Sequence, residues 1–264
     1  MIRITVLNDN RKMNDDFESE HGLSLLIEAD GKTILMDAGQ TDIYKSNARI
    51  LGIDLDTVDS IVLSHGDYDH GNGLKHFDKK VDLICHPHCN CYRISKRTGD
   101  FSGLNQTKDE LESRFNVKQN TNPYNITENV IFLGEIERKY DFEEKNLPAV
   151  DKDGEEYKHL DDSGIVIKTE KGIIVISGCA HSGICNTIEY AKKITGDNRV
   201  IAVMGGFHLK EVNESTLKTV EYMKKNNIRN ILLAHCTSDV VCEEFTKQLP
   251  KMVNIIKTGL TYEF

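Results

Sequence analysis

The chain has 264 residues, with 42 Asp or Glu against 33 Lys or Arg, and therefore a formal net charge of -9. This charge disfavours a nucleic-acid-binding protein, because affinity for a phosphate backbone comes from clustered Lys and Arg. The length suffices to bury a full hydrophobic core, and α/β chains of this size often form one domain. We therefore predict a single domain over residues 1–264 that acts on a small molecule.

The sequence also favours a cytoplasmic protein that does not enter a membrane. Charged residues interrupt every apolar run before it reaches the roughly 20 residues that span a bilayer. The first apolar run, residues 1–7, leads directly into polar Asn8-Asp9-Asn10, unlike a signal peptide. The seven cysteines are an odd number. Without a secretion signal they are better interpreted as thiols than as a disulfide framework.

Short β-rich runs alternate with turns in the first third of the chain. The predicted strands are residues 2–7, 24–28, 33–36, 60–63 and 81–85. Asp30-Gly31 is typical of a hairpin turn between the second and third of these strands. Residues 42–51 predict a modest helix that stops before Gly52.

The middle of the chain has a weaker pattern and more charge. We expect residues 86–160 to be an insertion that shapes a substrate pocket, with a strand at 130–133 and a loop at Asn120-Thr121-Asn122-Pro123. The other elements between residues 89 and 146 are not assigned from the sequence.

The last hundred residues repeat a strand followed by a helix. A hairpin is predicted for 165–168 and 173–177, and further strands for 200–204 and 230–233. Apolar stripes predict three intervening helices, marked by Ile184, Ile188, Ala191 and Ile194, by Leu217, Val220 and Met223, and by Val241, Phe245 and Leu249. A histidine follows three of the strands: His181, His208 and His235. Strand ends present polar groups to a ligand crevice, so these histidines are candidate site residues.

A second set of candidates follows the strand at 60–63. His65, Asp67, Asp69 and His70 lie within six residues, on a turn rich in glycine. Nitrogen and oxygen donors on so compact a turn can converge on a metal ion. Isolated His and Asp residues are usually ordinary surface groups, but four at this spacing indicate metal binding.

The run Ser64-His65-Gly66-Asp67-Tyr68-Asp69-His70-Gly71 resembles the H-x-H-x-D-H signature of the metallo-β-lactamase superfamily, with Asp67 in place of the usual second histidine. Further resemblance lies in Glu20-His21-Gly22-Leu23-Ser24, Met36-Asp37-Ala38-Gly39, Ser177-Gly178-Cys179-Ala180-His181, Met204-Gly205-Gly206-Phe207-His208 and Ala234-His235-Cys236-Thr237. Together these segments resemble the branch named after dihydropterin-ribofuranosyl-aminobenzene phosphate synthase. The resemblance covers nearly the whole chain.

The resemblance implies an α+β fold, an αβ/βα four-layer sandwich in which helices flank two mixed β-sheets. It also implies two divalent ions, with Zn2+ favoured and Mn2+ or Fe2+ as alternatives. By the same resemblance, the first ion would be held by His65, Asp67 and His181, and the second by Asp69, His70 and His235. Asp37 and Cys179 would lie behind these ligands and support them.

Two departures from the family pattern leave alternatives open. Asp67 stands where an imidazole is usual, and no Gly-Asp after a later strand supplies the familiar bridging carboxylate. Either His181 takes the missing ligand role, which we favour, or Cys179 coordinates instead. Free cysteine is more often a small buried hydrophobe.

Three other features are less specific. His208 is interpreted as a residue that binds substrate or donates a proton, although it could simply orient its loop, and His86 as a residue at the pocket border. The run from Cys85 to Cys91 lacks the second cysteine pair of a zinc ribbon, so we do not predict an independent zinc there. Arg93, with Lys96 and Arg97, is interpreted as part of a solvated face.

These features lead to a main functional hypothesis and three alternatives. The main hypothesis is a hydrolase of a small phosphorylated or cyclic ester, in which two metals lower the pKa of a bound water to about 7, Asp69 orients the resulting hydroxide and His208 protonates the leaving oxygen. The first alternative is a synthase-like condensation of a pterin precursor with an aminobenzene ribosyl phosphate. The others are a di-iron redox protein, suggested by the carboxylate at Asp67, and a metal-dependent ligand sensor without catalysis. The substrate is expected to be anionic, and the oligomeric state is not predicted.

Overall fold

The computed structural model describes residues 1–143 and 148–264, and these form two compact units. Unit 1 comprises the described residues of 1–121, 147–161 and 257–264, and unit 2 comprises those of 122–146 and 162–256. The predicted insertion at 86–160 contributes residues to both units. The expectation of a single domain with a pocket-shaping insertion stays a prediction.

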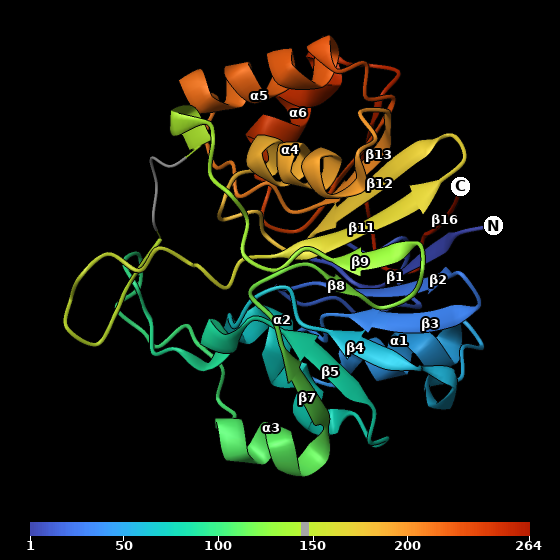
Figure 1. The fold of residues 1–264 in the computed structure, drawn as a ribbon, viewed down its shortest axis with the longest axis vertical. Coiled ribbons are helices and arrows are strands. Elements are labelled where there is room, and N and C mark those ends of the chain that lie inside the picture. Colours follow the sequence, from blue (N-terminus) through green and yellow to red (C-terminus); the bar gives the residue numbers. More distant parts are fainter. Residues whose placement is uncertain (144–147) are drawn as a thin grey trace. The chain divides into compact units, whose positions relative to one another are not determined.

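Unit 1 is built on a mixed seven-stranded sheet with the order β16-β1-β2-β3-β4-β5-β7 (Figure 1). Pairing is antiparallel from β16 to β3 and parallel from β3 to β7. The strands are β1 (Arg3–Asn8), β2 (Ser24–Ala29), β3 (Lys32–Met36), β4 (Ser60–Val62), β5 (Asp82–Cys85), β7 (Asn116–Gln119) and β16 (Thr261–Glu263). A separate ribbon pairs β6 (Ile94–Ser95) with β10 (Ala149–Val150).

The helical elements of unit 1 are short. They are α1 (Ile43–Ile50), α2 (Tyr68–Gly71) and α3 (Lys108–Arg114), with 3-10 turns η1 (Leu55–Thr57), η2 (Asn72–His76) and η3 (Pro87–Asn90). The strands and the helix predicted in this part of the chain are confirmed. β4 is buried along its whole length between β3 and β5. It therefore fixes the start of the loop that carries His65, Asp67, Asp69 and His70.

Unit 2 contains a second mixed seven-stranded sheet, with the order β15-β14-β13-β12-β11-β9-β8. Its strands are β8 (Tyr124–Asn125), β9 (Val130–Phe132), β11 (Gly164–Thr169), β12 (Gly172–Ser177), β13 (Val200–Gly205), β14 (Asn230–Leu233) and β15 (Val253–Ile255). Its helical elements are α4 (Ile184–Thr195), α5 (Glu214–Lys225), α6 (Asp239–Gln248) and the turn η4 (Asp141–Glu143). β12 to β15 pair in parallel, as the predicted alternation of strand and helix requires.

The core of unit 2 follows from its apolar pattern. Every residue of β12 is buried, as expected of a central strand covered on both faces. α4, α5 and α6 lie together (Figure 1). α4 buries Ile184, Ile188 and Ala191 as predicted, and it ends at Gly196, whose φ of 71° suits a glycine C-cap.

One predicted core residue of unit 2 is wrong. Leu217 on α5 is 46% exposed, whereas Val220 and Met223 are buried as predicted. Thr216, which lies four residues before Val220, is buried in place of Leu217. The buried face of the helix therefore passes through a threonine, which an apolar pattern does not mark.

Within the described residues, no helix has both the length and the apolar character needed to cross a bilayer.

Candidate metal centre

The loop after β4 brings four candidate donors together in unit 1. His65 and His70 are completely buried, Asp69 is almost buried, and the Asp67 side chain is 15% exposed. α2 begins directly after Asp67, so Asp69 and His70 are fixed on its single turn. Only glycine fits at position 66, because a Cβ there would overlap the carbonyl oxygen of Cys89.

Asp37 organises both histidines of this loop. Its carboxylate accepts the Ser64 N–H at 2.8 Å and the Ser64 hydroxyl at 2.7 Å, and it lies 2.7 Å from Nδ1 of His70. Ser64 Oγ is also 2.8 Å from Nδ1 of His65. Because the only hydroxyl proton of Ser64 goes to Asp37, Nδ1 of His65 must be the donor to Ser64. Both imidazoles therefore carry their proton on Nδ1, which leaves the lone pair on Nε2.

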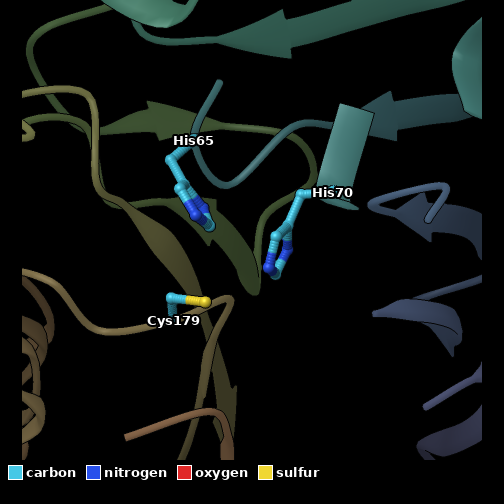
Figure 2. A group of neighbouring side chains, drawn as sticks. All are labelled: His65, His70 and Cys179. Carbon is cyan, nitrogen blue, oxygen red and sulfur yellow. The ribbon is translucent and has the colours of Figure 1, made fainter. Parts of the chain in front are cut away.

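The Nε2 atoms face the two loop carboxylates. Nε2 of His65 lies 3.4 Å from Asp67 Oδ2, and Nε2 of His70 lies 3.8 Å from Asp69 Oδ2. The ring centroids are 4.2 Å apart, and Figure 2 shows both side chains. Burial and His65 oppose a positive charge on His70, yet Asp37 and Asp69 raise its pKa. Carboxylates that favour a proton on this ring also favour a metal cation beside it.

Asp67, which replaces the usual histidine, is held by Arg93. Arg93 Nη1 lies 2.9 Å from Asp67 Oδ1, and Nη2 lies 2.9 Å from Asp161 Oδ2. The guanidinium carbon is 4.4 Å from the ring centroid of Tyr157, whose hydroxyl donates to Asp161 at 3.1 Å. Asp161 also accepts the Gly66 N–H at 2.8 Å. The prediction of Arg93 as part of a solvated face is wrong, because its side chain is completely buried in this network.

The electrostatics of the network fit an ion pair. Burial opposes ionisation of both Arg93 and Asp161, but their mutual attraction raises the pKa of Arg93 and lowers that of Asp161. His159 also lies 3.6 Å from Asp67 Oδ1. Asp67 therefore has one oxygen, Oδ1, turned to Arg93 and His159, and the other, Oδ2, turned to His65.

The sequence did not identify four residues that contact the donors or support them. His21 Nε2 lies 3.2 Å from Asp69 Oδ2, and the others are Arg93, His159 and Asp161. The sequence contains a pattern that could have identified two of them, since His159 and Asp161 lie two positions apart just before β11. His21 lies in a segment that carries the family resemblance, but nothing in that segment indicated its contact with Asp69.

In unit 2, the candidates gather at one edge of the sheet. β12, β13 and β14 are adjacent and parallel, so the segments that follow them start from the same edge. Cys179 and His181 follow β12, His208 follows β13 and His235 follows β14. Cys179 Sγ lies 3.1 Å from Nε2 of His235, and Figure 2 includes the Cys179 side chain.

His181 and His208 line a cavity of about 230 Å³ in unit 2. Their ring centroids are 4.4 Å apart. The remaining lining residues are Phe142, Glu143, Ala180, Gly183, Phe207, Leu209, Asn213, Glu214 and Ser215. Ala180 and His208 have φ of 53° and 48°, and Asp37 in unit 1 has 60°. Such backbone costs about 1–3 kcal/mol per residue and is concentrated at functional sites.

Two further predicted features also lie in unit 1, in the segment whose Cys89 carbonyl contacts Gly66. His86 is buried and begins the turn η3, where its Nδ1 accepts the His88 N–H at 3.1 Å. Cys85 and Cys89 are buried thiols. A hydrogen bond with Cys85, together with burial, raises the pKa of Cys89 well above its ordinary value. Cys89 is therefore protonated.

The residues present fit a divalent cation. Imidazole nitrogens and carboxylate oxygens are the donors that such metals take in proteins, and a histidine ligand usually gives its other ring N–H to a carboxylate. Asp37 provides that partner for His70. Each unit carries its own donors: His65, Asp67, Asp69 and His70 in unit 1, and Cys179, His181 and His235 in unit 2.

Comparison with known proteins agrees with this donor chemistry. The model of the metallo-beta-lactamase superfamily matches residues 20–235. The 7,8-dihydropterin-6-methyl-4-(beta-D-ribofuranosyl)-aminobenzene-5'-phosphate synthase of Methanocaldococcus jannaschii is 33% identical, over 94% of this chain and 92% of that protein. An uncharacterized protein of the same organism is 36% identical over 90% of each chain.

Among solved structures, this chain is similar to a metal-dependent hydrolase of the beta-lactamase superfamily. The identity is 28%, the TM-score is 0.85, and the match covers 100% of this chain and 99% of that one. The predicted fold class, with two mixed seven-stranded sheets and flanking helices, is confirmed. The chain belongs to the metallo-beta-lactamase superfamily and is a metal-dependent enzyme of that fold.

Proposed function

We propose that this enzyme joins a 7,8-dihydropterin to 4-(β-D-ribofuranosyl)aminobenzene 5'-phosphate. The observation that carries the proposal is the 33% identity to the synthase of Methanocaldococcus jannaschii, which extends over more than nine-tenths of both chains. This similarity favours the synthase alternative over the ester hydrolase of our main hypothesis. The substrates are small and anionic, and we propose no role for nucleic acid or membrane.

The proposed metal ligands come from both donor sets. His65, Asp67 and His181 would hold one divalent ion, and Asp69, His70 and His235 the other. The family model supports this assignment because residues 20–235 include all six positions. Zn2+ is the favoured metal, with Mn2+ or Fe2+ as alternatives. Divalent ions held there would stabilise negative charge on a phosphate group of the substrate.

The bond changes define what the side chains must do. A carbon–nitrogen bond forms between the 6-methyl carbon of the pterin and the aryl amine. The bond between that carbon and the oxygen of its phosphate ester breaks. The phosphate leaves with the electron pair, and the amine loses a proton. We assign orientation of the substrate to Asp69 and donation of a proton to the departing oxygen to His208. His86 is kept as a lower-ranked contact for the substrate.

A coupling assay tests the proposal. Purified enzyme loaded with Zn2+ is incubated with the aminobenzene ribosyl phosphate and a dihydropterin that carries a phosphate ester on its 6-methyl carbon. Mass spectrometry is expected to detect the coupled product. A chelator should abolish the product, and added Zn2+ should restore it. A metal-loaded protein that forms no coupled product would remove the synthase proposal.

Hydrolysis is the second candidate function, because the solved structure with a TM-score of 0.85 is described as a metal-dependent hydrolase. The same preparation is assayed with a panel of phosphodiesters and lactones. Cleavage of an ester without any coupling would favour a hydrolase, whereas coupling without cleavage would favour the synthase. Tight binding of both precursors without turnover would instead indicate a sensor.

The cavity in unit 2 gives a prediction for His208. Its ring lines the cavity beside His181, so we expect it to donate a hydrogen bond to an anionic group of the substrate. A hydrogen bond to a charged group contributes about 1.5 kcal/mol, which corresponds to roughly tenfold. His208→Gln should retain part of that bond but not the proton donation, while His208→Ala should raise KM about tenfold, and both variants should lower kcat. Steady-state kinetics would contradict this contact if both variants kept the KM of the parent enzyme.

A further inference from the structure

We propose that the cavity in unit 2 holds the pterin ring of the substrate, and that the Glu143 carboxylate accepts hydrogen bonds from the amino-pyrimidine edge of that ring. The inference rests on the proposed function, because it gives one of the two proposed substrates a place in the enzyme. It goes beyond that function by naming the residue that distinguishes the pterin from the aminobenzene ribosyl phosphate. All the residues that carry it belong to unit 2, and the residues assigned to pterin binding are not proposed metal ligands.

Glu143, at the end of η4, is held at the start of α4. Its Oε1 accepts the Cys185 N–H and its Oε2 accepts the Asn186 N–H, both at 2.8 Å. Gly183, with a φ of 94°, leaves room for this side chain, since a Cβ there would overlap the carboxylate. Glu143 also lines the cavity. Both carboxylate oxygens are therefore fixed in position at the cavity wall.

The carboxylate has capacity for stronger donors than it now has. Burial raises the pKa of Glu143 to about 7, although the N–H groups of Cys185 and Asn186 lower it. The Cys185 thiol is a further donor, but S–H groups donate weakly. A carboxylate with enough strong donors has a pKa below its ordinary value. N–H groups of a ligand would therefore stabilise the charged form of Glu143.

Apolar groups form other parts of the cavity wall. They are Phe142, Ala180, Phe207 and Leu209. Phe207 is buried and packs on Phe245 with ring centroids 5.9 Å apart, so its ring is fixed. Aromatic side chains suit the faces of planar heterocycles. The volume of about 230 Å³ is below the roughly 300–1,000 Å³ of sites that enclose drug-sized ligands, so the cavity fits one ring system better than a whole substrate.

The charge of the lining selects between the two proposed substrates. Among the described residues that line the cavity, Glu143 and Glu214 are acidic and none is Lys or Arg. Such a wall disfavours the phosphate of the aminobenzene substrate. The pterin ring is neutral and has two adjacent donors, N3–H and the 2-amino group, which match the two oxygens of a carboxylate. The cavity therefore takes the pterin, and the ester on its 6-methyl carbon would then meet His208, which lines the same cavity.

Fluorescence titration of the Zn2+-loaded enzyme with 6-hydroxymethylpterin tests the inference without reference to turnover. The second probe is 6-hydroxymethyllumazine, in which an oxygen replaces the 2-amino group. The parent enzyme is expected to bind the pterin about tenfold more tightly than the lumazine, the effect of one hydrogen bond to a charged group. Glu143→Gln should lose this preference, because its NH2 group can donate to the oxygen of the lumazine.

Two further variants accompany this titration. Phe142→Leu removes an aromatic face and keeps Glu143, so it should weaken the binding of both probes by the same factor and retain the preference for the pterin. Glu221→Gln removes an exposed carboxylate of α5 that is not among the lining residues, and it should bind both probes as the parent enzyme does. The comparison of the two probes in the parent enzyme needs no variant at all.

The coupling assay gives a second measurement. Glu143→Gln should raise KM for the phosphorylated dihydropterin about tenfold and leave KM for the aminobenzene ribosyl phosphate unchanged. A parent enzyme that binds both probes equally, or a Glu143→Gln variant that keeps the preference, would overturn the pterin site. Coupling with an unchanged KM for the pterin in Glu143→Gln would also overturn it and leave the proposed function standing. Preferential binding of the pterin without any coupled product would overturn the function and leave the pterin site standing.

Discussion

Replacing Arg93 by Met is expected to lower the free energy of unfolding by about 3–5 kcal/mol, because removing one partner of a buried ion pair leaves a charge uncompensated. The completely buried guanidinium bridges Asp67 and Asp161 with two contacts of 2.9 Å. Met has a similar length but no charge. Asp161, which is also completely buried, would then lose its main cationic partner.

Urea denaturation monitored by circular dichroism measures this effect, and two further variants control it. Arg97→Met removes an exposed charge from the same segment and should change stability by no more than about 0.5 kcal/mol. The double variant Arg93→Met with Asp161→Asn should recover part of the loss, because the uncompensated carboxylate is gone. A loss below about 1 kcal/mol in Arg93→Met would contradict the ion-pair interpretation.

Arg93 also illustrates what the sequence could not predict. Its neighbours include Lys96 and Arg97, and the local pattern indicates a solvated basic face. Its burial depends on Asp67, 26 positions earlier, and Asp161, 68 positions later. Pairing over such separations leaves no periodic signal in the chain, because a pattern records only which face of one element is apolar.

The strand-end histidines were predictable for the opposite reason. His181, His208 and His235 each follow a short apolar run, and the runs alternate with helical stripes. That alternation predicts parallel strands, and parallel strands start the segments that follow them from one edge. The contact between Cys179 and His235 was not predictable, because it depends on the exact geometry of two separate turns.

Asp67 was predictable only in part. The sequence identified it as a departure from the family pattern, but gave no reason for the carboxylate. The structure supplies one, since Arg93 and His159 face its Oδ1 while Oδ2 faces His65. A neutral histidine has no negative charge to balance the buried guanidinium of Arg93. Asp67 and Arg93 therefore depend on each other, and a histidine at position 67 would require a different residue at position 93.

Replacing Asp37 by Asn is expected to weaken metal binding about 10- to 100-fold, the usual cost of losing a partner that orients a ligand. The carboxylate of Asp37 accepts from Ser64 and from Nδ1 of His70. The Asn oxygen can still accept the Ser64 N–H, but its NH2 group would face Nδ1 of His70. That nitrogen would then have to accept, so the ring proton would move to Nε2 and block the lone pair proposed to bind metal.

Competition with a chromophoric chelator measures the affinity for Zn2+ in Asp37→Asn and in a matched control. The control is Asp59→Asn, since Asp59 accepts from Lys32 and the Thr33 N–H at the start of β3 and contacts none of the proposed ligands. It should bind Zn2+ as the parent enzyme does. Because the exchange of an oxygen for an NH2 group keeps the size of the side chain, a weaker affinity in Asp37→Asn alone would come from the tautomers of His70, which contacts Asp37 directly, and of His65, which contacts it through Ser64. Equal affinity in all three proteins would mean that Asp37 does not set the protonation of the imidazole.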